Sequence, residues 1–510
     1  MSMSFALRGT FVHSPVFGEV QVLQDTVCIV SGKRSGGKIL ALIPGADADS
    51  KMEELGLQAA VHQIPEGRLM CPGFIDTHVH APQYSYAGTA TDRPLMQWLD
   101  HYTFPREAQM QDLKEAKAHY NKLVERLISN GTTTALVFGS LHLEPTKLLA
   151  DILHQAGMRA YVGKVCMDRN SKNYYVQSTE QNLQDTEAFV EHIRGLNTVL
   201  VHPVITPRFV PCCTPALLQG LGAIAQRSIC HVQSHISESL DNDAFVAQLH
   251  PEVGGRDAQL YERAGLLTQR TVMAHGVTLT DAELRLLAER GTALAHCPLS
   301  NFYFADIPLD VLRCLAAGVK VGLGTDVAGG YSPSMLSAMR SAVLASKAVR
   351  MLHIDAARRQ AGCSNPCTAQ EPVRTLPAEE GSAAVGGHQE SQHPSSLSGS
   401  RAEAALQLPE PAGGSAAAVK AAAARRTLSY QEAFWLATMG GAQTLGLQDQ
   451  LGSFEVGKDF DALMIDASSG TTFDIFSADS LLDTFEKFVN LGDDRCIRAV
   501  WVQGGLLSWQ

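Results

Sequence analysis

Short apolar runs alternate with helix-like stretches through the middle of the chain. Eight runs are typical of buried strands: 73–80, 133–138, 160–165, 200–207, 231–237, 272–276, 293–296 and 319–324. Apolar residues spaced three and four apart predict helices between most of them: 111–129, 179–196, 215–227, 281–290, 308–317 and 334–352. Strands that alternate with helices form parallel sheets. The pattern predicts an α/β fold with a closed (β/α)8 TIM-like barrel. An open doubly wound sheet is the alternative, but no Gly-x-Gly-x-x-Gly turn follows the first strand.

The two ends of the chain have a different, β-rich pattern. Residues 1–72 contain short runs of branched residues separated by Gly, Pro, Asp and Ser, and 460–466 and 496–503 have the same character. Chain termini commonly lie near each other, so the two ends can share one sheet system. We therefore expect a composite β-sandwich domain from 1–72 and 454–510, with the barrel spanning 73–453.

The composition changes again between 360 and 426. This stretch has no Phe, Trp, Tyr, Ile or Met and is dense in Ala, Gly, Ser, Pro, Glu and Gln. It cannot bury enough apolar surface to offset the entropy of ordering. We expect a disordered insertion that interrupts the barrel, with transient helix at 416–426. The core pattern resumes at 429–445, where Ser429 and Glu432 have the spacing of a capping box.

The composition and the net charge limit which cellular compartment and which binding partners are expected. The 510 residues carry a formal net charge of −11, whereas nucleic acids and anionic membranes require a basic patch, so neither is an expected partner. No apolar run approaches the ~18 residues of a transmembrane helix. The N-terminus lacks the apolar segment of a signal peptide. The 11 cysteines are scattered and odd in number, which fits reduced thiols in the cytosol.

Polar side chains end five of the predicted strands. In a barrel these ends meet at one edge, where barrel enzymes keep their active sites. A His-x-His pair is expected about once by chance in a chain of this length and composition. The pair His78 and His80 is informative only because other strands bring polar side chains to the same edge. His78 and His80 also point to the same face of their strand, because side chains alternate along a strand. The residues, in chain order, are His78, His80, His235, Glu238, His275, His296 and Asp326.

Neutral imidazoles and a carboxylate form the ligand set of a catalytic zinc, which keeps one position for water and lowers its pKa toward ~7. The set is His78, His80, His235 and Asp326. Glu238 lies three residues beyond His235 and is not needed as a ligand, so we expect it to move a proton. Asp326 can accept the water proton, and His275 can orient the hydroxide or polarise the electrophile. Each residue alone would be interpreted as a satisfied polar core group or a helix cap.

A second metal would need a bridging group from a strand between the first and the fifth. The fourth strand and its end, 201–209, contain no Lys, Glu or Asp. Lys164 on the third strand could bridge if carbamylated, but we expect a structural lysine. One metal ion is therefore predicted.

Residues beside this set suit a flat heterocycle. Gln83 follows His80 by three residues and can both donate and accept. Arg208 and Phe209 end the fourth strand; an arginine fork donates to a carbonyl and a ring nitrogen, and Phe provides a stacking face. The alternative is that Arg208 pairs with an acidic neighbour while Phe209 packs in the barrel.

Together these motifs resemble the amidohydrolase superfamily and, within it, the guanine deaminase family. The matching segments are 72–88, 94–99, 102–105, 130–134, 162–168, 206–209, 233–238, 273–276, 322–331 and 452–462. The resemblance covers nearly all of the chain outside 360–426. It departs at Leu299, where Asn is expected after His296-Cys-Pro, and in the last residues of the chain.

The resemblance implies a zinc-dependent hydrolase with one zinc per subunit on the four ligands named above. Hydroxide would attack C2 of guanine, Glu238 would pass a proton to the ring, and ammonia would leave to give xanthine in purine catabolism. It also implies a cytoplasmic homodimer. The implied guanine contacts are His80, Ala81, Pro82, Gln83, Arg208, Phe209, His235, Glu238 and Asp326.

Two other functions are compatible with these residues. One is an amidohydrolase acting on a different ring, such as a chlorotriazine hydrolase or an adenosine-type deaminase. The other is a non-catalytic scaffold built on the same barrel. Gln83, Arg208 and Phe209 favour guanine, and the complete ligand set argues against a scaffold.

Overall fold

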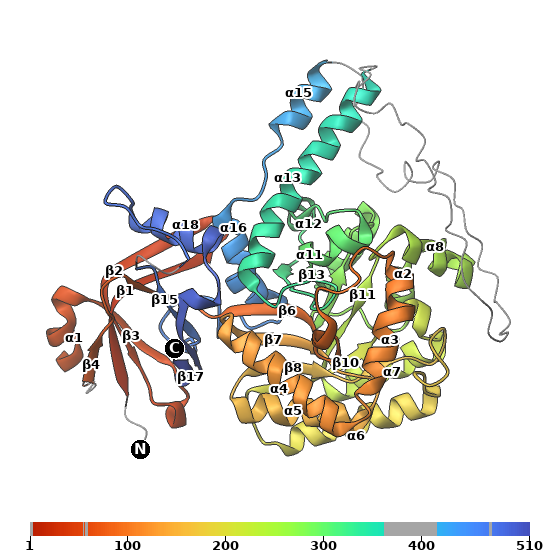
Figure 1. Ribbon diagram of the computed structural model, residues 1–510, viewed down its shortest axis with the longest axis horizontal. Coiled ribbons are helices and arrows are strands. Elements are labelled where there is room, and N and C mark those ends of the chain that lie inside the picture. Colours follow the sequence, from red (N-terminus) through yellow and green to blue (C-terminus); the bar gives the residue numbers. More distant parts are fainter. Residues whose placement is uncertain (1–3, 55, 57–59, 362–415, 469–471, 510) are drawn as a thin grey trace, which may run out of the picture. The chain divides into compact units, whose positions relative to one another are not determined.

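The computed structural model describes residues 4–54, 56, 60–361, 416–468 and 472–509 (Figure 1). Residues 1–349 and 427–510 form one compact unit, and 350–426 form a second. The disorder predicted for 360–426 falls mainly on 362–415, outside the described residues. Helix α15 (Ala416–Ala424) lies where transient helix is predicted.

Eight parallel strands form a barrel in the first unit, as predicted. Each strand pairs with the next one along the chain, apart from the two-residue β9 (Val165–Cys166), which pairs with β10. The barrel closes where the amide of Asp326 donates to the carbonyl of His78 and the amide of His80 donates to that of Val327. The strands are β6 (Phe74–His80), β7 (Thr132–Phe138), β8 (Arg159–Gly163), β10 (Val201–Pro207), β11 (His231–Ile236), β12 (Thr271–His275), β13 (Ala293–His296) and β14 (Val321–Leu323).

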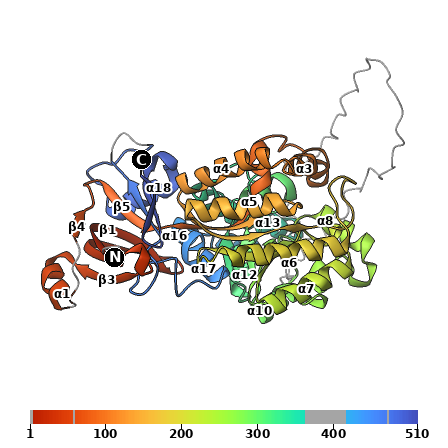
Figure 2. The same cartoon turned by 90° about the horizontal axis from the view of Figure 1, so that it is seen from below.

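Helices lie along the outside of these strands (Figure 1 and Figure 2). Their starts follow from local sequence: Asp112 accepts from two amides of the first turn of α4, and Thr280 forms a capping box with Glu283 at α10. Among the described residues, no helix has the length and hydropathy needed to cross a bilayer. The helices are α4 (Leu113–Ser129), α5 (Leu143–Ala156), α6 (Thr179–Gly195), α7 (Pro215–Ser228), α8 (Leu240–Leu249), α9 (Asp257–Arg263), α10 (Asp281–Arg290), α12 (Val311–Ala316) and α16 (Tyr430–Trp435). Helix α13 (Met335–Gln360) begins in this unit, and its residues from 350 on belong to the second unit.

Both chain ends contribute to one mixed sheet, which confirms the predicted composite β part. Its order is β17-β16-β15-β5-β1-β2-β3, with β4 paired to β1. The ends meet where β15 runs antiparallel to β5, with Ala462 opposite Pro72. The predicted limits at 72 and 454 remain a prediction. The strands are β1 (Phe5–Val16), β2 (Glu19–Val30), β3 (Ile39–Pro44), β4 (Ala60–Gln63), β5 (Arg68–Pro72), β15 (Ala462–Asp466), β16 (Ile497–Val502) and β17 (Gly505–Trp509).

The chain passes from this sheet into the barrel at Gly73. A Cβ at this position would lie 2.2 Å from the side chain of Thr133, so only glycine fits between β5 and β6. A buried ion pair joins the same two regions, because Arg159 at the start of β8 contacts Asp459 and Asp461 ahead of β15.

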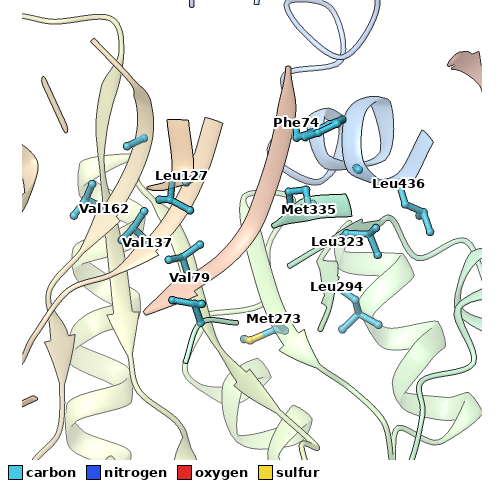
Figure 3. Packing of buried hydrophobic residues seen from close by; sticks show 14 of the residues in the cluster. Phe74, Val79, Leu127, Val137, Val162, Met273, Leu294, Leu323, Met335 and Leu436 are labelled. Carbon is cyan, nitrogen blue, oxygen red and sulfur yellow. The ribbon is translucent and has the colours of Figure 1, made fainter. Parts of the chain in front are cut away.

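The packing of the barrel strands decides which side chains reach the interior. Figure 3 shows Val79, Val137 and Val162, from three neighbouring strands, near Leu127 of α4 in one buried apolar cluster. Burying such a side chain stabilises the fold by roughly 1.5–3 kcal/mol. Because side chains alternate along a strand, Val79 in this outer layer turns His78 and His80 toward the barrel interior.

Candidate active site

The four predicted metal ligands meet at the carboxyl ends of the barrel strands. His78 and His80 end β6, His235 lies on β11, Asp326 follows β14, and all four are buried. Nε2 of His80 lies 3.0 Å from Nε2 of His235. Oδ1 of Asp326 lies 3.1 Å from Nε2 of His78 and 3.5 Å from Nε2 of His80.

These donor atoms have the spacing of ligands around a shared ion. Ligands at ~2.1 Å from a tetrahedral zinc lie about 3.4 Å from one another. Nε2 of His78 is buried, and its 3.1 Å contact with Oδ1 of Asp326 is not aligned as a regular hydrogen bond. Nδ1 of His235 donates to the carbonyl of Arg208 at 2.7 Å, which leaves the lone pair of its Nε2 facing the cluster.

The charge state of the imidazoles also suits a metal. Burial, together with the nearby His78, lowers the pKa of His80 and of His235 well below the usual value. Both are therefore neutral, the form in which histidine binds metal. The residues present thus fit a single divalent cation.

Backbone strain marks the same place. His275 and Asp326 have φ values of 74° and 50°, a region that non-glycine residues adopt rarely and at a cost of order 1–3 kcal/mol. Asp76 supports the turn: its carboxylate accepts from the amide and the hydroxyl of Thr325, at 3.0 and 2.5 Å. Strain of this kind clusters at functional sites.

The predicted proton carriers lie beside the metal donors. Nε2 of His275 is 3.5 Å from Oε1 of Glu238 and 3.8 Å from Oδ2 of Asp326, and Nδ1 of His275 bonds to Asn301 at 2.9 Å. Burial raises the pKa of Glu238. Burial acts the same way on Asp326, but His78 and His275 outweigh it and hold the pKa of Asp326 well below its usual value. Two carboxylates with pKa values pushed apart can divide acid and base roles.

A cavity joins these groups to the predicted substrate residues. Ala81 and Pro82, also predicted to contact the substrate, are buried in the turn after β6 and do not line it. Leucine and aromatic side chains from two other segments, including Trp98 and Phe304 with ring centroids 4.7 Å apart, form the remaining wall. The lining is His80, Gln83, Leu95, Trp98, Leu99, Arg208, Phe209, His235, Glu238, Phe304, Asp326 and Gly329.

This cavity is small. Its volume is about 30 Å³, whereas a cavity of about 150 Å³ accommodates benzene. A purine is larger than benzene, so this volume does not hold one. Trp98 and Phe304 belong to two segments of the cavity wall. Both segments contain a π-helical turn, Leu99–Thr103 and Asn301–Ala305, of a kind frequent at functional sites.

Sequence reasoning missed Glu107, which pairs with Arg208 beneath the cavity wall. Nη1 of Arg208 lies 2.6 Å from Oε2 of Glu107, and both side chains are buried. The interpretation of Arg208 as paired with an acid is therefore correct. Arg208 also lines the cavity, and its contact with the substrate stays a prediction. Phe209 likewise lines the cavity while it packs in a buried apolar cluster.

The groups that could bind a metal overlap with the site described above, and Lys164 has a structural role. Among the described residues, the only donor groups that could hold a metal are His78-His80-His235 and His78-His275-Asp326. Lys164 is buried and donates to the carbonyl of Val165 and to the side chains of Gln177 and Asn182.

Comparisons with known proteins agree with this arrangement. The model of the amidohydrolase family matches residues 69–366 and 399–507. A guanine deaminase of Dictyostelium discoideum is 35% identical over 98% of both chains, and one of Mus musculus is 36% identical over 98% of this chain and 96% of that protein. Among solved structures, guanine deaminase from C. acetobutylicum with bound guanine superposes with a TM-score of 0.78 and 28% identity, covering 99% of each chain.

Proposed function

Since the chain belongs to the amidohydrolase family, we propose that it hydrolyses guanine to xanthine and ammonia with one bound zinc. The observation that carries the proposal is a single cavity in which metal donors spaced 3.0–3.5 Å apart face Arg208, Gln83 and Phe209. Full-length similarity to guanine deaminases supports the choice of substrate. A triazine hydrolase from Arthobacter aurescens shares the fold with a TM-score of 0.71, but it is 16% identical to this chain, whereas the guanine deaminases are 35% and 36% identical.

The residues divide the reaction into metal binding, substrate orientation and proton transfer. Zinc on His78, His80, His235 and Asp326 would supply hydroxide at neutral pH. The lowered pKa of Asp326 keeps its carboxylate ionised, so that it is in the form that can accept the proton of the attacking water.

Residues on the other side of the cavity orient the substrate and assist the departure of the leaving group. Arg208 and Gln83 donate to the ring so that C2 faces the hydroxide, and Phe209 packs beside the ring. Glu238, which holds a proton because its pKa is raised, protonates the ring nitrogen. His275, 3.5 Å from Glu238, orients the nucleophile. The proton that Asp326 took from water passes to the 2-amino group, the C2–N bond breaks to release ammonia, and the hydroxyl left on C2 returns a proton to Glu238 as it becomes the carbonyl of xanthine.

The decisive experiment combines metal analysis with ammonia release. We expect about one zinc per chain by mass spectrometry and ammonia from guanine, but not from adenine or cytosine. Chloride release from a chlorotriazine would favour the rival amidohydrolase. Zinc-loaded protein that releases no ammonia from guanine would refute the proposal.

The proposal includes a homodimer that acts in the cytoplasm in purine catabolism. Its support is the resemblance to the family and the sequence features described above. Light scattering of the purified chain and localisation of the tagged full-length protein test these two parts separately; a monomer would refute the first and a membrane-associated pool the second.

A further inference from the structure

Glu107, on α3 (Phe104–Gln109), joins the two side chains predicted to hold the substrate. Its Oε2 accepts from Nη1 of Arg208 at 2.6 Å and from the hydroxyl of Tyr175 at 2.7 Å. Its Oε1 accepts from Nε2 of Gln83 at 2.8 Å and from Nη2 of Arg208 at 3.2 Å. Glu107 is 1% exposed and does not line the cavity. It therefore acts from behind the residues that do.

These contacts fix the amide of Gln83 in one orientation. Since Nε2 donates to Glu107, Oε1 points the other way, where it accepts from the amide of Ala328 at 3.3 Å. One N–H and one lone pair remain for a ligand. A carboxylate behind the amide thus decides which end of Gln83 donates.

Glu107 also fixes the guanidinium of Arg208. The carboxylate takes two of its five N–H groups in a fork, and the ring of Phe104 covers one face with its centroid 5.2 Å from Cζ. The remaining N–H groups are directed rather than mobile. Tyr175 holds the carboxylate in turn, and its own hydroxyl accepts from the amide of Leu141.

The pair has an electrostatic consequence for the cavity. A buried Arg208 alone would attract anions, but the contact with Glu107 cancels its charge within 2.6 Å. The wall therefore offers N–H donors without net positive charge. Such a wall suits a neutral ring with a carbonyl acceptor. A ring that has an amino group in place of that oxygen would leave buried donors unpaired.

We propose that Glu107 is a positioning residue that makes the site selective for neutral oxopurines over their amino and anionic analogues. This inference rests on the proposed function, because it concerns the same cavity. In this proposal Glu107 sets the direction of the N–H donors and removes the net charge of the cavity wall. Arg208 and Gln83 make the contact with the ring.

The test compares guanine with 2,6-diaminopurine, in which an amino group replaces the 6-oxygen. In Glu107→Gln we expect the KM for guanine to rise at least about tenfold while kcat changes less than about threefold. The ratio of kcat/KM for the two substrates should fall at least about tenfold. Inhibition by anionic purine carboxylates should strengthen, because Arg208 is left uncompensated. Zinc content should stay at the wild-type level.

Two milder variants keep the inference testable if Glu107→Gln does not fold. Glu107→Asp keeps the charge and shortens the reach. Tyr175→Phe removes the 2.7 Å hydrogen bond to Glu107 together with the one that the hydroxyl accepts from the amide of Leu141. Both should raise the KM for guanine less than the glutamine variant and leave inhibition by anions weak. Asp459→Asn, which disturbs a buried arginine pair outside the cavity, is the matched control and should leave KM unchanged.

The outcomes separate the two proposals. Wild-type protein that releases no ammonia from guanine refutes the proposed function. Active wild type together with an unchanged substrate ratio in Glu107→Gln, or in both milder variants if that one fails to fold, overturns the role of Glu107. Loss of zinc from Glu107→Gln would also overturn it, since the residue would then act through the metal.

Discussion

The buried ion pair of Arg159 should contribute several kcal/mol to stability. Its Nη2 lies 2.7 Å from Oδ2 of Asp459 and 3.4 Å from Oδ1 of Asp461, and these side chains are only 2–4% exposed. Arg159→Met keeps much of the stem but leaves two buried carboxylates without this cation. Removing one partner of a buried pair costs about 3–5 kcal/mol. Lys38, 2.6 Å from Asp459, still compensates one charge, so we expect about 3 kcal/mol.

Urea unfolding followed by circular dichroism measures this loss. Arg495→Met is the matched control, because Arg495 and Asp493 are 73% and 39% exposed and such pairs contribute about 0.2–1 kcal/mol. Changing Asp459 and Asp461 to Asn in the Arg159→Met background should restore part of the stability, since no buried carboxylate without a cation remains and Lys38 is 40% exposed to solvent. Turnover of the folded variant should be unchanged, because Arg159 begins its strand and the site lies at the strand ends. A loss in Arg159→Met no larger than that in Arg495→Met would refute the reasoning.

Three further changes test the site and its support. His78→Ala should lose both zinc and ammonia release, and a variant that keeps its zinc would contradict the ligand assignment. Glu238→Gln should lower kcat by about 10²–10⁴ with zinc retained, and a kcat near the wild-type value would exclude a proton-transfer role. Burial raises the pKa of Asp257 to about 7, so the stability it contributes is present below about pH 4 and lost as the pH rises to about 7. The free energy of unfolding of the wild type relative to Asp257→Asn should therefore fall across this range, and a constant difference would contradict this.

The barrel was predictable because of where parallel strands lie. They are buried on both faces, so they appear in the sequence as continuous apolar runs bounded by breakers. Helix α5 (Leu143–Ala156) was not predicted, although Pro145 is well placed in its first turn. The π-helical turns above the cavity were not predictable either, since their sequence pattern does not differ from that of an ordinary helix.

The metal donors were predictable for a topological reason. Parallel strands bring their carboxyl ends to one edge, so His78, His235 and Asp326 meet although they are far apart in sequence. Their spacing of 3.0–3.5 Å was not predictable. It depends on the left-handed backbone at Asp326, which nothing in the local sequence requires.

Glu107 escaped prediction because it does not lie at a strand end. It belongs to the long excursion between β6 and β7, where a search for ligands at the barrel edge does not look. The need to compensate a buried charge points to this segment. Arg208 is predicted inside the barrel, where an unpaired cation costs several kcal/mol, so a buried acid must accompany it. The carboxylates at the strand ends, Glu238 and Asp326, are the ones proposed to act in catalysis, which leaves the connecting segments to supply that acid. The same requirement is consistent with the ligand contact proposed for Arg208: a buried arginine can direct its N–H groups at a neutral ring only when its charge is already matched.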